Sequence, residues 1–246
     1  MSNERVLIVG CSYVENLDCV DPLNPNSQLD RTRLVLRGTS GAGNQAIAAR
    51  TVYECSLENF DHVYILWSGI NRLDFPIGRE LHKVQPIGKH GYPKYPYFSE
   101  LGEMVWYHSG GFRLSGTSDE CPKWLQQFYD NQYKSATPRY LTDLSLLSII
   151  QAQTFLDINQ IPYSMSFIYD VHNNYRETYI EPGCGQIDTE SSLFNLVNWK
   201  KFSAKIPPFE YARKNGKLEI DRFHPKFESM HQWFLNEFNL DLLAKN

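Results

Sequence analysis

The feature that most constrains the fold is a short apolar run near the N-terminus. Residues Val6 to Val9 read Val-Leu-Ile-Val, and the run ends at Gly10-Cys11-Ser12. Four consecutive β-branched or leucine residues are typical of a strand buried on both faces, as in a parallel sheet. Ligands of open parallel sheets bind beyond the carboxyl ends of the strands. Ser12 is therefore expected where chemistry is usually done, although a serine at this point also serves as a helix cap.

The rest of the chain alternates strand-like and helical segments, which predicts an α/β fold on a mostly parallel sheet. Further strands are expected at 34–36, 62–67 and 162–169. An Ala-rich helix is expected through Ile47 and Tyr53, a shorter helix near 191–201, and a last helix from Pro225. A long helix is expected over 138–159, with its apolar face at Leu141, Leu144, Leu147 and Phe155.

Residues 75–137 interrupt this alternation. The stretch is rich in Gly, Pro and Tyr, and a connection of this length is usually functional or disordered. Its aromatic content, which includes Trp106 and Trp124, argues against disorder. We expect an insertion or lid within the domain. A sugar-stacking cover over Ser12 and a plain packed subdomain both account for the aromatic residues.

Composition excludes several classes of protein. The net charge is −4 with no stripe of Lys and Arg, which argues against a nucleic-acid surface. No apolar stretch approaches the roughly 20 residues that span a bilayer, and no signal-peptide pattern is present, so a cytoplasmic location is expected. The five cysteines are widely spaced without a C-x-x-C pair. That pattern indicates free thiols in a reducing compartment, and neither disulfides nor a zinc site.

Three strand ends carry residues suited to acyl transfer. Ser12 follows the first strand, Gly41 the second and Asn71 the third, and such ends converge on one edge of a parallel sheet. Asp221 and His224 stand three residues apart just before the last helix. A serine nucleophile needs a histidine base, a carboxylate that orients the histidine, and donors for the oxyanion. The N–H groups of Ser12 and Gly41 and the amide of Asn71 would be those donors.

The order Ser, Gly, Asn and Asp-x-x-His resembles the SGNH (GDSL-type) hydrolase superfamily. The motifs are Gly10-Cys11-Ser12, Ser40-Gly41-Ala42-Gly43-Asn44, Gly69-Ile70-Asn71 and Asp221-Arg222-Phe223-His224. The resemblance runs from end to end of the chain but skips the long middle stretch. It implies a three-layer, flavodoxin-like α/β/α fold with a central, mostly parallel sheet. One domain would cover residues 1–246, with 75–137 as its aromatic-rich insertion.

The resemblance also implies a serine esterase that removes short acyl groups, among them O-acetyl groups of a carbohydrate. Ser12 would attack the acyl carbonyl, His224 would take its proton and Asp221 would hold the imidazole. Ser12, Gly41 and Asn71 would stabilise the oxyanion. Neither a cofactor nor a metal is implied, and the partner is a small-molecule or carbohydrate ester. Compact members without signal peptides are similar to phage and environmental bacterial proteins, so release by lysis or packaging in a virion is a further expectation.

Two departures from the family pattern keep a second function open. Cys11 stands where the family usually has Asp before the serine, and Arg72 stands where Asp usually follows the asparagine. A catalytically altered or inactive module that binds a glycan or a protein fits these changes. A flavodoxin-like nucleotide binder is a third alternative. Cys11 could also be the nucleophile, but cysteine is among the most buried residue types, and burial is the preferred interpretation.

Several other residues admit a functional and a structural interpretation. Asp221, His224 and His231 could bind a metal, but His231 is in phase with the apolar face of its helix and is expected to be a satisfied core histidine. The glycines from 38 to 43 suggest a phosphate cradle but match no phosphate-binding motif. His108 and His172 have no evident partner and are expected at the surface.

Overall fold

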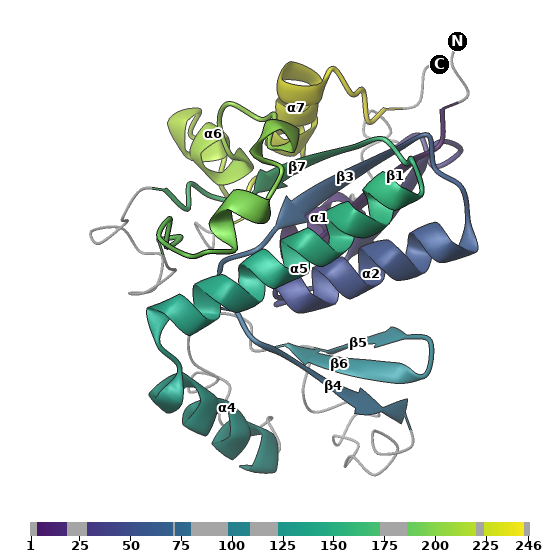
Figure 1. Ribbon diagram of the computed structural model, residues 1–246. Helices are drawn as coiled ribbons and strands as arrows, with labels where there is room; N and C mark the ends of the chain where they lie inside the picture. Colours follow the sequence, from purple (N-terminus) through teal and green to yellow (C-terminus); the bar gives the residue numbers. More distant parts are fainter. Residues whose placement is uncertain are drawn as a thin grey trace, which may run out of the picture.

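A four-stranded parallel sheet forms the centre of the molecule (Figure 1). The computed structural model describes residues 4–18, 29–70, 72–79, 98–108, 123–172, 186–219 and 224–243. The strands are β1 (Val6–Gly10), β2 (Leu34–Gly38), β3 (His62–Trp67) and β7 (Tyr163–Phe167), in the order β2-β1-β3-β7. A flavodoxin-like sheet has this order, with the second strand on one side of the first and later strands on the other. The predicted α/β fold is confirmed.

β1 is one of the two inner strands of the sheet, as its composition predicts. Every residue of β1 is buried, and the strand pairs in parallel with β2 on one side and β3 on the other. Gly10 lies opposite Gly38 of β2 and Leu66 of β3, so the three strands end at one level. The residues that follow them therefore meet at one edge of the sheet.

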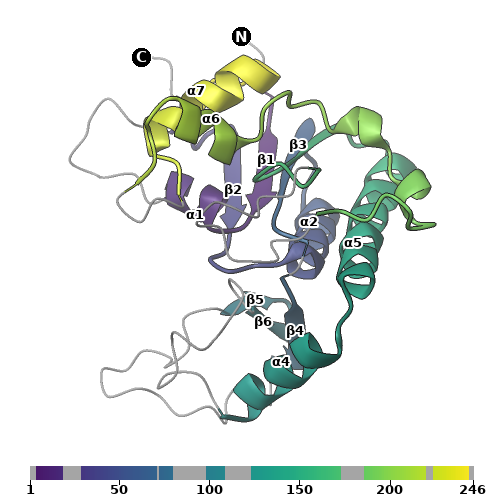
Figure 2. The same ribbon diagram turned by 90° about the vertical axis from the view of Figure 1, so that its left-hand side faces the viewer.

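Helices cover both faces of the sheet and make three layers (Figure 2). α2 (Asn44–Leu57) and α5 (Pro138–Ile158) lie together on one face. α1 (Ser12–Asp18), α6 (Pro208–Lys214) and α7 (Phe227–Phe238) lie on the other. None of the described helices is long and apolar enough to cross a bilayer.

The buried face of α5 differs from the predicted one. Leu147 is 50% exposed, whereas the buried side chains include Leu146, Ile149 and Ala152. Leu141 and Leu144 are half-buried and pack on a second, smaller core. Apolar residues occur on two faces of α5. One face packs on α2, and the N-terminal end of the helix also packs on the inserted segment. The helix predicted near 191–201 is instead two short 3₁₀ turns, η3 (Phe194–Leu196) and η4 (Trp199–Lys201).

The inserted stretch contains its own antiparallel sheet. β4 (Asp74–Gly78), β5 (Phe98–Leu101) and β6 (Met104–His108) pair in the order β4-β6-β5, and α4 (Lys123–Ser135) follows. Five buried side chains form the core of this part: Leu73, Ile77, Val105, Tyr107 and Tyr129. The described part of the insertion is thus a packed subdomain. Residues 80–97 and 109–122 lie outside the described residues, and the role of the insertion as a lid stays a prediction.

The close approach of β2 to α1 predicts a sharp effect at Gly38. A Cβ on Gly38 would lie 1.9 Å from the backbone nitrogen of Glu15, which is backbone and cannot rotate away. Gly38→Ala is expected to lower the free energy of unfolding by about 3 kcal/mol, measured by urea denaturation. Gly78→Ala is the matched control, because a Cβ there meets nothing within 4 Å. Equal unfolding midpoints for the two variants would contradict the packing described.

Candidate active site

Ser12 and His224 lie within hydrogen-bonding distance although 212 positions separate them. The Ser12 Oγ and the His224 Nε2 are 2.8 Å apart. Ser12 is the first residue of α1, directly past the carboxyl end of β1, and it is buried. A hydroxyl at this distance from an imidazole nitrogen can pass its proton to that nitrogen. The pair thus has the geometry that a nucleophile and its general base require.

A short two-stranded ribbon holds His224 in place. Leu218 pairs with Pro225 in an antiparallel bridge. The Glu219 N–H donates to the His224 carbonyl at 2.7 Å, and the Lys226 N–H donates to the Lys217 carbonyl at 2.9 Å. Asp221 falls in the connection 220–223, outside the described residues. Its predicted role as the orienting carboxylate therefore stays a prediction.

The neutral ring of Tyr13 lies beside the imidazole of His224. Its ring centre lies 5.6 Å from that of His224. Burial raises the pKa of Tyr13 well above its ordinary value of 10, and the nearby Cys11 and Tyr169 add to the rise. The phenol therefore stays neutral at any ordinary working pH and places no anion next to His224.

Gly41 occupies a turn that only glycine adopts without strain. The Ala42 N–H donates to the Thr39 carbonyl at 3.2 Å, and Gly41 between them has a φ of +75°. A positive φ at the third position of a turn is the mark of type II, which requires glycine there. The Thr39 N–H donates to the Gly10 carbonyl at 3.2 Å, which brings the turn next to the end of β1.

A second contact attaches this turn to the helix that begins with Ser12. The Ser40 hydroxyl donates to the carboxylate of Glu15 on α1. Among the described residues, no acceptor is found for the Gly41 N–H. The N–H of Ser12, in the first turn of α1, likewise has no partner within its own helix. The Gly41 turn is therefore attached to the first turns of α1, the helix that begins with Ser12.

Asn71 itself lies outside the described residues, but the chain just before it is firmly held. The fully buried side chain of Asn44 accepts the Ser68 N–H at 2.8 Å and donates to the Ser145 hydroxyl at 3.1 Å. Ser145 in turn donates to the Ile70 carbonyl at 2.9 Å. Sequence reasoning gave Asn44 no role. The sequence signal that could have identified Asn44 is its position, since it is a polar residue in the first turn of a helix that follows the end of a strand.

The two departures from the family pattern both have structural roles. Arg72 Nη1 donates to the Ala42 carbonyl at 3.3 Å, so Arg72 joins the loop after β3 to the Gly41 turn. Cys11 is fully buried in the main core, which confirms the preferred interpretation of that residue.

The first turn of α2 is occupied by a carboxylate of the protein itself. Asp74 accepts the N–H groups of Gly43 and Ala46, each at 2.9 Å. His108 Nδ1 lies 2.8 Å from the same carboxylate, and both side chains are fully buried. An acidic side chain that already satisfies this helix end leaves no place for a phosphate. The phosphate-cradle alternative is therefore wrong, as is the surface position expected for His108.

Two other histidines carried expectations, which His172 meets in full and His231 meets in its polar partner but not in complete burial. His172 is exposed. His231 is half-buried, and its Nε2 lies 3.1 Å from the Asp241 carboxylate, so this helix histidine has a polar partner. Within the described ranges, no group of three or more His, Cys, Asp or Glu side chains is arranged to hold a metal ion.

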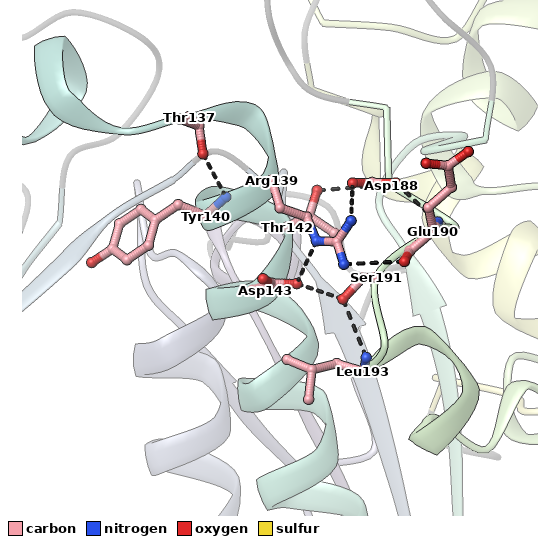
Figure 3. A network of polar contacts seen from close by, with 9 residues as sticks. All are labelled: Thr137, Arg139, Tyr140, Thr142, Asp143, Asp188, Glu190, Ser191 and Leu193. Carbon is pink, nitrogen blue, oxygen red and sulfur yellow. Dashed lines mark hydrogen bonds and ion pairs between the residues drawn. The ribbon is translucent and has the colours of Figure 1, made fainter.

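A polar network fixes the chain beyond β7 to the start of α5 (Figure 3). Arg139 pairs with Asp188 at 2.9 Å and donates to the Glu190 carbonyl at 3.0 Å, and Ser191 donates to Asp143 at 2.5 Å. The Ile187 N–H donates to the Val171 carbonyl at 2.9 Å. The segment that follows β7 thus returns to the start of α5 and is held there. This is the same carboxyl edge of the sheet that carries Ser12.

Comparisons with known proteins are sparse. No family model matches the chain, and no curated protein matches it. Two solved structures, both variants of Axe2, an acetyl-xylooligosaccharide esterase from Geobacillus, are similar over 100% of this chain and 98% of theirs. The TM-scores are 0.45 and 0.43, with 12% and 14% sequence identity.

The buried cysteines predict a simple chemical test of the nucleophile. Cys11 is inaccessible, and burial, with a smaller effect of Glu54, raises the pKa of the Cys55 thiol to about 12. Because the thiolate is the reactive form, iodoacetamide at pH 8 is expected to leave both residues unmodified in the folded protein. Both should react in urea, as measured by peptide mass spectrometry. Alkylation of native Cys11 would return it as a candidate nucleophile.

Proposed function

We propose that the protein is a serine esterase of the SGNH type that hydrolyses short acyl esters. The observation that carries this proposal is the 2.8 Å contact between Ser12 Oγ and His224 Nε2 at the carboxyl edge of a parallel sheet. The Gly41 turn beside it supports the proposal, because it brings a backbone donor to the same edge. Neither a metal ion nor a cofactor is needed for this chemistry.

In the first half of the reaction the acyl group moves to the enzyme. Ser12 Oγ attacks the acyl carbon while His224 Nε2 takes the hydroxyl proton, and the carbonyl oxygen becomes an oxyanion. The N–H groups of Ser12 and Gly41, with the Asn71 amide, donate to that oxygen. The tetrahedral intermediate collapses, His224 returns the proton to the leaving alkoxide oxygen, and an alcohol departs.

In the second half, water releases the acyl group. His224 takes a proton from water as the water oxygen attacks the acyl-enzyme carbonyl, and the same donors hold the second oxyanion. Collapse breaks the bond to Ser12 Oγ, which regains its proton from His224, and a carboxylic acid leaves. Asp221 would keep the imidazole in the tautomer with its free Nε2 toward Ser12 and would stabilise the imidazolium.

We propose a carbohydrate as the alcohol part of the ester, with acetyl as the acyl group. The aromatic insertion supports this choice: Trp124 on α4 is 44% exposed, and its ring lies 6.4 Å from that of Phe75 and 6.0 Å from that of Tyr107. Flat aromatic faces with polar edges suit an amphipathic partner such as a sugar ring. Release of acetate from acetylated oligosaccharides is the matching assay.

Substitution of the proposed nucleophile and base tests the assignment directly. Ser12→Ala and His224→Ala are each expected to lower kcat for p-nitrophenyl acetate by about 10⁶, since the two act as a unit. A fluorophosphonate probe should label wild-type Ser12 stoichiometrically and should fail to label either variant. Wild-type rates in Ser12→Ala would reject the assignment, and an unlabelled wild type would favour the binding module instead.

The two proposed site residues outside the described ranges have graded expected effects. Asn71→Ala removes one oxyanion donor and is expected to cost about 10²–10³ in kcat. Asp221→Asn disturbs the histidine tautomer and is expected to cost up to about 10⁴. Glu219→Gln, an exposed acidic residue on the same ribbon as His224, is the control and should keep wild-type kcat. Full activity in Asp221→Asn would remove that residue from the triad.

A further inference from the structure

Asp74 joins the inserted sheet to the turn that carries Gly41. We propose that Asp74 is a positioning residue for the oxyanion hole, an inference that rests on the proposed esterase function. Within the described residues, its carboxyl group bonds to Gly43, Ala46 and His108 and not to Ser12 or His224, so its effect would pass through the backbone that it holds.

The contacts of the carboxylate lie just past the proposed donor. Asp74 Oδ1 accepts the N–H of Gly43, two residues after Gly41, and Oδ2 accepts the N–H of Ala46. Both bonds are 2.9 Å long and buried. They hold the first turn of α2, and the Gly41 turn leads directly into this helix.

The packing around Gly43 leaves no room for a side chain. A Cβ on Gly43 would lie 2.8 Å from Asp74 Oδ2 and 2.9 Å from the Arg72 carbonyl oxygen, closer than real Cβ contacts come. The Asp74 carboxyl group and the loop after β3 therefore pack in direct contact with the backbone at Gly43, next to the Gly41 turn. Because protein interiors are close-packed, a shift of the carboxylate moves that backbone with it.

His108 holds Asp74 from the side of the inserted sheet. Asp74 on β4 and His108 on β6 are directly paired residues of the antiparallel ladder, and their side chains meet at 2.8 Å. Nδ1 of His108 meets the same Oδ1 that accepts the Gly43 N–H. The inserted sheet thus fixes the carboxyl group that holds the start of α2, directly after the Gly41 turn. The carboxyl group lies at the positive end of the α2 dipole, where acidic side chains are favoured.

Two other contacts hold the same corner from the remaining sides. Arg72 donates to the Ala42 carbonyl, and Asn44 holds the Ser68 N–H. With Asp74, these contacts tie the loop after β3 to the start of α2 on both sides of position 71. Oxyanion donors act only within about 2.7–3.1 Å of the oxyanion, and a 1 Å displacement can cost about 10² in rate.

The test compares Asp74→Ala with Thr137→Ala, because both remove a side chain that accepts N–H groups at a helix start. Thr137 caps α5 by accepting the Tyr140 N–H at 3.1 Å and belongs to no part of the proposed site. Asp74→Ala is expected to lower kcat for p-nitrophenyl acetate about 10²-fold with KM little changed, and to slow fluorophosphonate labelling of Ser12 in parallel. Thr137→Ala is expected to lower Tm without a change in kcat. A folded Asp74→Ala with wild-type kcat, or an equal loss of kcat in Thr137→Ala, would overturn the proposal.

Conservative variants keep the test decisive. His108→Asn retains a donor near the Nδ1 position and is expected to keep more of kcat than His108→Ala; equal losses in kcat and Tm would count against the positioning role. If Asp74→Ala does not fold, Gly43→Ala displaces the same carboxylate and should lower kcat, and wild-type kcat there would overturn the proposal. The Ser12→Ala control separates the hypothesis of esterase function from the hypothesis that Asp74 positions the oxyanion hole. Activity without Ser12 rejects the esterase assignment, whereas an inactive Ser12→Ala beside a fully active Asp74→Ala rejects only the role of Asp74.

Discussion

β1 is hydrogen bonded in parallel to β2 on one side and to β3 on the other, which sets Gly10, Gly38 and Leu66 in one row across the sheet. Because parallel strands end on the same side, the three loops that follow them must share one edge. This register brings Ser12, the Gly41 turn and the loop after β3 together. A shift of one residue in either pairing would turn the side chains of that strand to the opposite face.

Polar contacts then lock the three loops to each other, buried at Asp74 and half-buried at Glu15 and Arg72. Glu15 holds the Gly41 turn to α1, Arg72 holds it to the loop after β3, and Asp74 holds the start of α2. A buried polar group without a partner costs free energy comparable to a lost hydrogen bond, so each of these groups favours the one arrangement that satisfies it. These polar contacts, in addition to apolar packing, therefore fix the edge of the sheet in one arrangement.

Sequence reasoning succeeded where the signal was local. The apolar strands and the long helix that begins at Pro138 are predicted by patterns among neighbouring residues. It failed where a partner was distant. His108 was expected at the surface because its partner Asp74 lies 34 residues earlier, and the pair forms only when β4 and β6 align. The exposed Leu147 was expected in the core because an apolar residue on a helix does not reveal which neighbours the helix meets.

What the chain alone determined is the set of local conformations: a strand buried on both faces that ends at Gly10, just before Ser12, and a positive-φ turn that needs Gly41. These follow from backbone sterics and side-chain shape within a few residues. Only the tertiary structure decided that His224 reaches Ser12, that Asp74 occupies the start of α2, and which face of α5 is buried. Such contacts join residues far apart in the chain, and their energy is realised only once the sheet and both helix layers have closed around them.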